Sequence, residues 1–405
     1  MFISHLEGAI DGARLPPNTL QTTHNDKPIW VRYDLKSVAA AVSRAALKAR
    51  EADLWRYREF LPVPVKTPRV TLGEIMTPLL HTEKLGMEFG VKNLWIKDES
   101  RLPTGSFKSR GMALAITMAK QFGVKRIALP TAGNAGAAAA AYAAQAGMET
   151  FVFMPEDTPG VNQIETKLYG AKAFLVNGLI NDCGRIVREA TTELNCFDMS
   201  TLREPYRIEG KKTMGLELAE QMNWKLPDVI LYPTGGGTGL IGMWKAFKEL
   251  KEIGWLENDM MPRMVAVQSE RCCPIVKAYQ DGKRFAEPFP NARTVASGIR
   301  VPSAIGDFMI LDSIRESGGT AVAVDENKII EWMKLAIEKT GISVCPEAAA
   351  CVGALEKLAK DKWIGLNESV VIFNTAAALK YFDSIEIDLP RIDINEKIDW
   401  AALAK

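Results

Sequence analysis

The sequence predicts an α/β protein built from two doubly wound parallel-sheet domains, on the basis of three observations. Short apolar runs alternate with longer helical patterns from about residue 91 to 375. Most of these runs are continuously apolar, which is typical of strands buried on both faces of a parallel sheet. The chain has 405 residues, more than the roughly 250–300 at which one hydrophobic core stops growing. We therefore expect two domains with a cleft between them.

The expected strands come in a regular order along the chain. They cover residues 94–96, 127–129, 150–154, 173–176, 229–232, 264–267, 321–324 and 370–373. Several of them end at proline or glycine, as the second does before Pro130. Helical patterns between them cover 135–146, 181–194, 215–223, 240–253, 327–339 and 347–360. Right-handed crossovers would place these helices on both faces of each sheet, with ligands beyond the carboxyl ends of the strands.

The remaining segments complete the expected domain organisation. Residues 1–75 form an N-terminal extension with a basic helical stretch at 37–50, and we expect it to pack on a partner subunit or on the core. Residues 76–224 form the first domain and residues 225–389 the second. Residues 390–405 are expected to form a short C-terminal tail.

Charge and composition exclude several classes of function. The 50 basic and 49 acidic residues give a net charge of +1, so neither nucleic acid nor an anionic membrane is an expected partner. The first residues lack the pattern of a signal peptide, and no apolar run is long enough to span a membrane, so we expect a cytoplasmic protein. The six cysteines form no Cys-x-x-Cys pair and there are three histidines, so we expect no metal site and no disulfide scaffold.

Lys108 is the first candidate catalytic residue. It lies among small residues in the stretch 103–111, between an expected strand and an expected helix. Partial burial there would lower the pKa of the amine and supply the neutral form that attacks a carbonyl to make a Schiff base. The structural alternative is a helix start at which Gly105 and Ser106 cap the first turn.

A glycine-rich loop further along the chain predicts a phosphate site. Gly235-Gly236-Gly237-Thr238-Gly239 follows the strand at 229–232 and opens the helix at 240–253. Glycines let the backbone approach a phosphate closely, and the helix N-terminus directs N–H groups and a positive dipole end toward it. The loop has neither the lysine of a nucleotide P-loop nor G-x-G-x-x-G spacing, so it suits one phosphate monoester.

Two further loops follow expected strands and lie at the same edge, where the carboxyl ends of the strands are expected. Residues 131–136 contain Asn134, which can either donate a hydrogen bond to a ligand oxygen or cap the alanine-rich helix that follows. Thr375 follows the strand at 370–373. A reactive lysine, a cradle for one phosphate and two polar loop residues together describe a pyridoxal phosphate site.

These motifs resemble those of the fold-type II pyridoxal phosphate enzymes, whose architecture is that of the tryptophan synthase β chain. Within that class the chain looks most like threonine synthase. The resemblance covers roughly residues 70 to 385, and its motifs lie at 72–79, 105–111, 131–136, 205–213, 235–239 and 374–375.

The resemblance implies a role for each motif residue. Lys108 would be the Schiff-base lysine, with Phe107 and Asn134 also at the cofactor. Gly235 to Gly239 would hold the cofactor phosphate, and Thr375 would face the pyridine nitrogen. The family converts O-phosphohomoserine and water to threonine and phosphate and suggests a homodimer. The candidate substrate ligands are Thr131 for the carboxylate and Arg110, Arg207, Lys211 and Lys212 for the phosphate, and a surface salt bridge is the structural alternative for each of the four cations.

Two other functions stay open at the level of sequence. The glycine loop has no asparagine and is similar to that of threonine and serine dehydratases, so a β-eliminating ammonia-lyase is the alternative enzyme. The stretch 207–213 looks more like threonine synthase. A non-catalytic protein that keeps the cofactor for regulation is the third hypothesis, and retention of both Lys108 and the glycine loop disfavours it.

Overall fold

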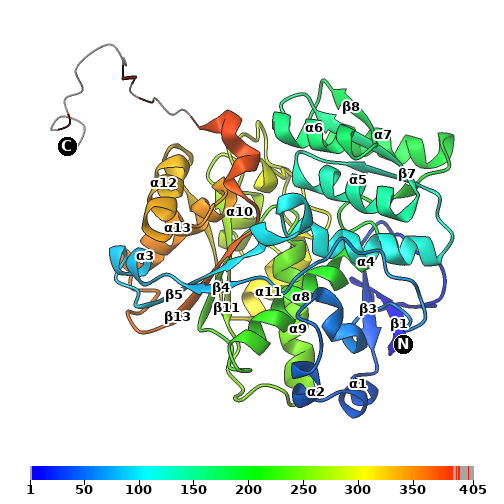
Figure 1. The fold of residues 1–405 in the computed structure, drawn as a ribbon, viewed down its shortest axis with the longest axis horizontal. Helices are drawn as coiled ribbons and strands as arrows, with labels where there is room; N and C mark the ends of the chain where they lie inside the picture. The colour runs from blue at the N-terminus through cyan, green and yellow to red at the C-terminus, as the bar shows by residue number, and fades with distance from the viewer. Residues whose placement is uncertain (1, 386–388, 390, 393–399, 401–405) are drawn as a thin grey trace.

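The largest sheet of the computed structural model has six strands and runs through the left half of Figure 1. The structure describes residues 2–385, 389, 391–392 and 400. All neighbouring strands in this sheet are parallel except the edge strand β4, which is antiparallel to β5. The strand order is β12 (Thr320–Val324), β11 (Arg263–Ser269), β10 (Val229–Pro233), β13 (Ser369–Asn374), β5 (Asn93–Asp98) and β4 (Leu79–His81).

A second, four-stranded sheet is parallel throughout. Its order is β8 (Lys172–Val176), β7 (Glu149–Pro155), β6 (Arg126–Pro130) and β9 (Phe197–Asp198). Every strand expected from the sequence is present in one of these two sheets. The two parallel sheets confirm the α/β fold class.

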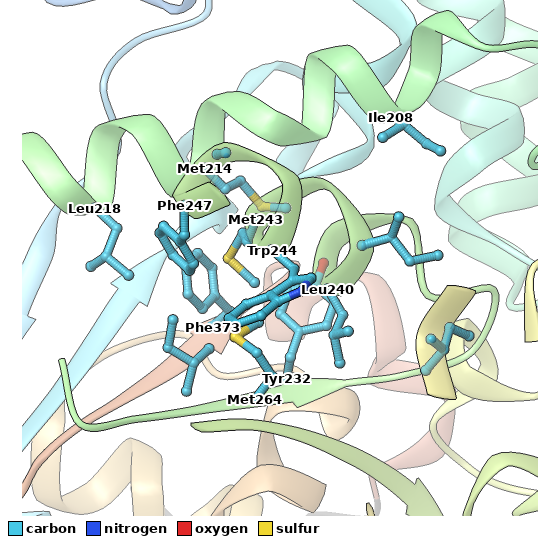
Figure 2. Close-up of a cluster of buried hydrophobic side chains, with 14 of the residues drawn as sticks. Ile208, Met214, Leu218, Tyr232, Leu240, Met243, Trp244, Phe247, Met264 and Phe373 are labelled. Atoms are coloured by element: carbon cyan, nitrogen blue, oxygen red, sulfur yellow. The ribbon is translucent and has the colours of Figure 1, made fainter. Parts of the chain in front are cut away.

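Alternate residues of each large-sheet strand enter different cores, which explains why the strands are continuously apolar. Val229 and Leu231 pack toward α12 (Ile329–Thr340) and α13 (Pro346–Lys360). Ile230 and Tyr232 pack on the opposite face, toward α9 (Thr238–Glu252) and α11 (Asp307–Glu316). Figure 2 shows this second core, in which side chains of α9 meet those of the strands: Leu240, Met243, Trp244 and Phe247 with Tyr232, Met264 and Phe373.

The small sheet is also covered on both faces. One face packs on α4 (Lys108–Gln121) and α5 (Asn134–Ala146), which share a core with β6. The other face packs on α7 (Ile180–Glu193). The short helix α6 (Gly160–Leu168) lies beside α5 and β8. The remaining short helices of the large sheet are α3 (Glu83–Glu88) and α10 (Pro274–Gln280).

Helix α8 (Tyr206–Gln221) lies at the centre of the molecule, between α4 and α9. The sequence predicts a helix only from residue 215, whereas α8 begins nine residues earlier. Glycines make the close contacts with its neighbours possible: a Cβ on Gly210 would lie 2.0 Å from the carbonyl oxygen of Arg110. On the other side, a Cβ on Gly242 of α9 would lie 2.9 Å from the amide nitrogen of Lys212.

The N-terminal extension forms an antiparallel sheet of β1 (Ile3–Gly8), β2 (Arg14–Leu15) and β3 (Ile29–Tyr33). The helix expected at 37–50 is divided into α1 (Leu35–Ala41) and α2 (Arg44–Lys48), because Val42 is extended and Ser43 caps the second helix. The extension packs on α8 of its own chain. The Tyr33 hydroxyl donates to Glu209 at 2.8 Å, and Arg56 pairs with Glu220 at 2.6 Å.

The sheets group the chain differently from the expected boundaries at residues 76 and 225. Strands β4 and β5 precede Lys108 in sequence, yet they pair in the large sheet because β5 is hydrogen-bonded to β13 along its whole length. The expected tail at 390–405 lies almost entirely outside the described residues. Among the residues that are described, no helix is both long enough and apolar enough to cross a membrane.

Candidate active site

A cavity of about 510 Å³ opens where loops from the carboxyl ends of both parallel sheets come together. Its wall includes the loops that follow β6, β10 and β13 and the first residue of α4. This volume is in the range of small-molecule sites. The position is the one expected for ligands of open parallel sheets.

Lys108 is the first residue of α4 and lines this cavity. Two backbone hydrogen bonds join the start of α4 to the segment after β13: Phe107 N donates to Thr375 O at 2.9 Å, and Ala377 N donates to Gly105 O at 3.0 Å. Burial, together with the nearby Arg207 guanidinium, lowers the pKa of the Lys108 amine to about 8. A pKa this low provides a substantial fraction of neutral amine near physiological pH.

The structural alternative is that Gly105 and Ser106 cap the first turn of this helix, and the side-chain contacts do not support it. Among the described residues α4 has no side-chain cap at its N-terminus, and Ser106 contributes only its backbone carbonyl, which accepts from the Ser109 amide at 3.3 Å. The Ser109 hydroxyl donates to the Pro103 carbonyl, and it lies 3.1 Å from the Thr104 hydroxyl. These contacts hold the loop before α4, and Lys108, the first residue of the helix, lines the cavity.

The glycine loop connects β10 to α9 and lines the cavity from Gly235 to Gly239. Gly237 is the N-cap of α9 and has a φ of +72°, a conformation that favours glycine. A Cβ on Gly239 would lie 1.9 Å from the Tyr232 hydroxyl oxygen, so no side chain fits there. The loop therefore presents backbone N–H groups and a helix N-terminus to the cavity, which suits a phosphate group.

Asn134 lines the cavity at the start of α5 and does not cap that helix. Its Nδ2 donates to the Tyr381 hydroxyl at 3.0 Å, while none of the described residues makes a hydrogen bond to its buried Oδ1. Thr131 shapes the same loop, because its hydroxyl oxygen accepts from the amides of Gly133 and Gly136, both at 3.1 Å. The geometry therefore does not support the cap, and the atom that Asn134 leaves for a ligand is the acceptor Oδ1, because the donor Nδ2 is engaged by Tyr381.

Thr375 follows β13 and lies in the cavity wall, almost fully buried. Its hydroxyl oxygen is 3.6 Å from the Cys345 sulfur. The neighbouring Asn374 is a structural residue: its side chain donates to Asp98 at 2.9 Å and accepts from the Cys345 amide at 3.1 Å. The polar group that this loop offers to a ligand is therefore Thr375.

Arg207 is a buried cation in the cavity wall with no carboxylate partner among the described residues. One of its terminal nitrogens donates to the Met199 carbonyl at 2.9 Å, and within the described part of the chain its Nε has no hydrogen-bond partner. Desolvation lowers the pKa of this guanidinium, which means that its charge is not fully compensated by the protein. Such a group favours an anionic ligand.

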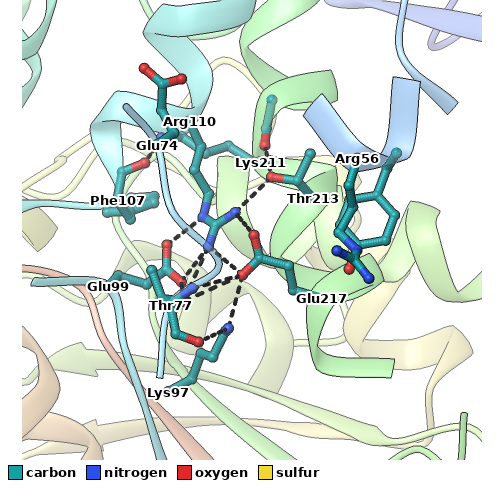
Figure 3. Close-up of polar contacts among 12 residues, drawn as sticks. Arg56, Glu74, Thr77, Lys97, Glu99, Phe107, Arg110, Lys211, Thr213 and Glu217 are labelled. Atoms are coloured by element: carbon teal, nitrogen blue, oxygen red, sulfur yellow. Dashed lines mark hydrogen bonds and ion pairs between the residues drawn. The ribbon is translucent and has the colours of Figure 1, made fainter. Parts of the chain in front are cut away.

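Arg110, a substrate ligand in the sequence analysis, lies in a buried ion-pair cluster (Figure 3). Its guanidinium contacts Glu99 at 2.6 Å and Glu217 at 2.6 Å, and Lys97 reaches the same Glu217 at 2.9 Å. Arg110 is fully buried and is not among the residues that line the cavity. With both carboxylates engaged it has no nitrogen directed at a ligand, so we do not retain it as a substrate residue.

Lys211 is also absent from the cavity lining. Its Nζ donates to the Phe107 carbonyl and lies 4.1 Å from the centre of the Phe107 ring. The Nζ of Lys108 lies 4.2 Å from the centre of the same ring. Lys211 therefore supports the residue that precedes Lys108, and we do not retain it as a substrate ligand.

Other cavity residues are missing from the sequence analysis. Among them are Ser297 and Arg300 from the loop before α11, Glu347 in the first turn of α13, and Tyr381 after β13. The one local sequence signal beside these residues is Pro346, which precedes Glu347 and marks the start of a helix. No glycine run or strand end marks the loop at 297–300, and it reaches the cavity only through the packing of the large sheet.

The site and the fold together define a fold-type II pyridoxal phosphate enzyme. The pattern of the family described as pyridoxal-phosphate dependent enzyme matches residues 70–376. Among solved structures, maize serine racemase superimposes with a TM-score of 0.63 at 22% identity, covering 75% of this chain and 88% of that one. A fungal L-serine ammonia-lyase from Rhizomucor miehei gives 0.64 at 22%, covering 76% and 97%.

The curated relatives narrow the class further. Threonine synthase of Methanocaldococcus jannaschii is 35% identical over 349 residues, which is 86% of this chain and 85% of that protein. Threonine synthase of Methanosarcina acetivorans is 36% identical over 351 residues, with the same shares, and that of Mycobacterium tuberculosis is 30% identical over 337 residues, 83% and 90%. The chain belongs to the threonine synthase family of pyridoxal phosphate-dependent lyases.

The residues of the cavity fit this cofactor. The amine of Lys108 can form a covalent bond with the aldehyde of the cofactor. The backbone N–H groups at the helix N-terminus beside Gly237 can donate hydrogen bonds to its phosphate. Asn134 has a buried oxygen without a partner in the same wall, as expected where a ligand completes the hydrogen bonding. Pyridoxal phosphate is the cofactor of this family.

Proposed function

We propose that the protein converts O-phosphohomoserine and water to threonine and phosphate. The observation that carries this proposal is Arg207, a buried guanidinium without a carboxylate partner among the described residues, in the wall that also holds Lys108. A substrate with its own phosphate would supply the missing anion. The relatives named threonine synthase support the same reaction.

Lys108 would act twice in this reaction, as the covalent anchor of the cofactor and as a base. When bound, pyridoxal phosphate withdraws electron density from the substrate's α and β carbons and so makes their protons removable. The Lys108 amine, with a pKa lowered to about 8, is suited to accept such protons and return them. From the start of α4, where Lys108 lines the cavity, its amine would reach the reacting carbons.

Other residues would bind and orient. The N–H groups of Gly235 to Gly239 would hold the cofactor phosphate, and Thr375 would accept or donate at the pyridine nitrogen. Asn134 and the ring of Phe107 would contact the cofactor ring. Thr131 holds the loop whose free N–H groups are the candidates for the substrate carboxylate.

The test is product analysis with the purified, cofactor-loaded protein. O-phosphohomoserine, threonine, serine and phosphoserine are supplied separately, and phosphate, threonine and keto acid are measured. We expect phosphate and threonine from O-phosphohomoserine alone. Replacement of Arg207 by Met should raise KM for O-phosphohomoserine by about tenfold or more while leaving the cofactor absorbance unchanged. Keto acid from threonine or serine, without phosphate release, would contradict the proposal.

That contradicting outcome is the alternative function, a β-eliminating ammonia-lyase. The specific observation that favours it is the glycine loop, in which no asparagine side chain reaches toward the cavity. A hydroxy-amino acid has no phosphate, so on this alternative Arg207→Met should leave KM for threonine unchanged.

We further propose that the protein is a homodimer. Helix α6 and the adjacent edge strand β8 expose large apolar side chains: Ile164, Leu168, Phe174 and Leu175. Exposed apolar residues gathered on an open sheet edge are typical of surfaces that a partner covers. Light scattering that gives the mass of one chain at micromolar concentration would contradict this proposal.

A further inference from the structure

Glu347 is a buried carboxyl in the cavity wall that none of the roles above uses. It lies in the first turn of α13 and is 3% exposed. One oxygen, Oε1, accepts a hydrogen bond from the Gly298 amide at 2.7 Å. The other oxygen, Oε2, is buried and makes no hydrogen bond within 3.5 Å among the described residues, and Glu347 lines the same cavity as Lys108.

This arrangement differs from that of other buried glutamates in the described part of the chain. Glu99 and Glu217 pair with Arg110, and Glu209 pairs with Lys212 at 2.7 Å. Glu347 has no lysine or arginine nitrogen within 4.0 Å among the described residues. A buried carboxylate without a cation is costly, and the cost is avoided when the group keeps its proton.

The groups around Glu347 agree with a protonated carboxyl. Cys345 is the N-cap residue of α13 and Cys351 lies on that helix, while Lys108 is nearby on α4 and Tyr381 on the segment after β13. Burial raises the pKa of Glu347, and the Gly298 amide and the Tyr381 hydroxyl oppose this increase without cancelling it. Tyr381 has a pKa raised well above its ordinary value, so it adds no negative charge.

We propose that Glu347 is the acid of this site and the partner of the base Lys108. On the proposed function, its carboxyl proton moves to the bridging oxygen of the substrate phosphate as the bond between that oxygen and the γ carbon breaks. The electron pair of the bond stays on the oxygen, and phosphate leaves with the proton. Lys108 has by then taken one proton from a substrate carbon, so transfer of one proton from its ammonium to Glu347 restores both neutral groups.

The first test measures the protonation of Glu347 without reference to activity. The infrared spectrum of the cofactor-loaded Glu347→Gln variant is subtracted from that of the wild type at neutral pH. We expect the carbonyl band of a protonated carboxyl to appear in the difference spectrum. Bands of a carboxylate in its place would overturn the proposal.

The second test compares leaving groups that differ in their need for a proton. Glutamine keeps the acceptor for the Gly298 amide but cannot supply the acid. We expect Glu347→Gln to lower kcat for O-phosphohomoserine roughly 100-fold or more, as for other general acids. With 2-amino-4-chlorobutanoate, from which chloride leaves unprotonated, the decrease should be less than about threefold.

Controls separate the acid from a structural role. Glu326 is buried but outside the cavity, and both of its oxygens accept hydrogen bonds, so Glu326→Gln should leave both rates within about twofold of wild type. Equal decreases on the two substrates in Glu347→Gln, or no decrease, would overturn the proposal. If Glu347→Gln does not fold, Glu347→Asp retains the acid and should keep more activity on O-phosphohomoserine than Glu347→Ala.

The same comparison remains valid if the proposed substrate is wrong. A wild type that makes keto acid from serine and no phosphate from O-phosphohomoserine would end the proposed function alone. Glu347 would then be tested by comparing serine with β-chloroalanine. The hydroxyl group of serine needs a proton to leave as water, whereas the chloride of β-chloroalanine leaves without one. A loss confined to serine would still support the acid.

Discussion

At the scale of single residues, the site depends on ionisable groups that the protein leaves without an ion-pair partner. Lys108, Arg207 and Glu347 line one cavity, and none of them has an ion-pair partner within the described residues. Arg110, which lies outside the cavity, is by contrast paired with both Glu99 and Glu217. Uncompensated groups in a low-dielectric cavity are available to a ligand, and their protonation is easily shifted.

The first prediction concerns the pKa of Lys108. Because the neutral amine captures the cofactor aldehyde and its pKa is about 8, the capture rate by cofactor-free protein should rise about tenfold per pH unit up to pH 8 and then level off. The visible absorbance of the bound cofactor measures this rate. Lys108→Ala should show no such absorbance and no turnover. A rate that keeps rising to about pH 10 would contradict the lowered pKa.

The second prediction concerns the glycine loop. A Cβ on Gly236 would lie 3.0 Å from the Thr201 methyl group, which requires only a small adjustment of the protein. Gly236→Val should therefore fold but bind the cofactor about tenfold more weakly or worse, because the side chain occupies the space that a phosphate needs. Gly239→Ala should instead lower the melting temperature, since its Cβ would meet the Tyr232 hydroxyl at 1.9 Å. Unchanged cofactor affinity in Gly236→Val would remove this loop from the site.

At the scale of elements, α8 shows how a helix with many charges is buried. Arg207, Glu209, Lys211, Lys212 and Glu217 are all almost fully buried on it. Glu217 joins the cluster with Arg110, and Glu209 joins a second cluster with Lys212 and Lys245. These pairs replace apolar contacts along the helix, so the sequence carries no apolar stripe for the first half of α8.

The third prediction uses two adjacent lysines of α8 as a matched pair. Burial lowers the pKa of Lys211 well below its ordinary value, whereas the carboxylates of Glu209 and Glu249 raise the pKa of Lys212. Lys211→Met should leave the free energy of unfolding equal or higher at pH 7, because an amine that is costly to bury is removed. Lys212→Met leaves carboxylates undercompensated and should cost about 3 kcal/mol.

The pH dependence of these variants follows from the signs of the shifts. A lowered lysine pKa costs stability below the unfolded value near 10.5, so any gain in Lys211→Met should shrink as pH rises toward 10.5. A raised pKa contributes stability that is present below 10.5 and lost above it, so the loss in Lys212→Met should be constant from about pH 7 to 9. Denaturant unfolding at several pH values measures both. Equal losses in the two variants at pH 7 would contradict the different environments.

At the scale of the whole molecule, the two parallel sheets meet through polar contacts beside the cavity. Arg300, in the cavity wall, pairs with Asp157 after β7 at 2.5 and 2.6 Å. Nearby, Lys380 pairs with Glu165 of α6, and the Gly160 amide donates to Asp383 at 3.0 Å. These contacts join the segment after β7 to the large sheet on one side of the cavity.

The fourth prediction concerns this junction. Asp157 is exposed, so Asp157→Asn should change the free energy of unfolding by less than about 1 kcal/mol. The substitution frees Arg300 from the small sheet, and we expect KM for the substrate to rise several-fold with a smaller change in kcat. Asp312→Asn breaks an ion pair with Arg284 away from the cavity and should change neither constant. Unchanged KM in Asp157→Asn would show that the pair does not influence ligand binding.

The strands, the glycine loop and two of the site residues could be predicted from short stretches of the sequence. Continuous apolar runs specified the strands because both faces of each parallel sheet are covered. Glycines specified the loop at 235–239 because Gly237 has a φ of +72° and a Cβ on Gly239 would meet the Tyr232 hydroxyl. Lys108 and Asn134 could be selected because each follows a strand end at the ligand-binding edge. Each of these features depends on a few consecutive residues.

Only the tertiary structure decided which charges face the cavity. Arg110 and Arg207 look alike in sequence, yet one is enclosed by Glu99 and Glu217 and the other has no carboxylate partner among the described residues. Glu347 enters the site because α13 packs on the large sheet beside the loop of Gly298. A charge is compensated or left available by neighbours far away in sequence, and the spacing of residues along the chain does not record those neighbours.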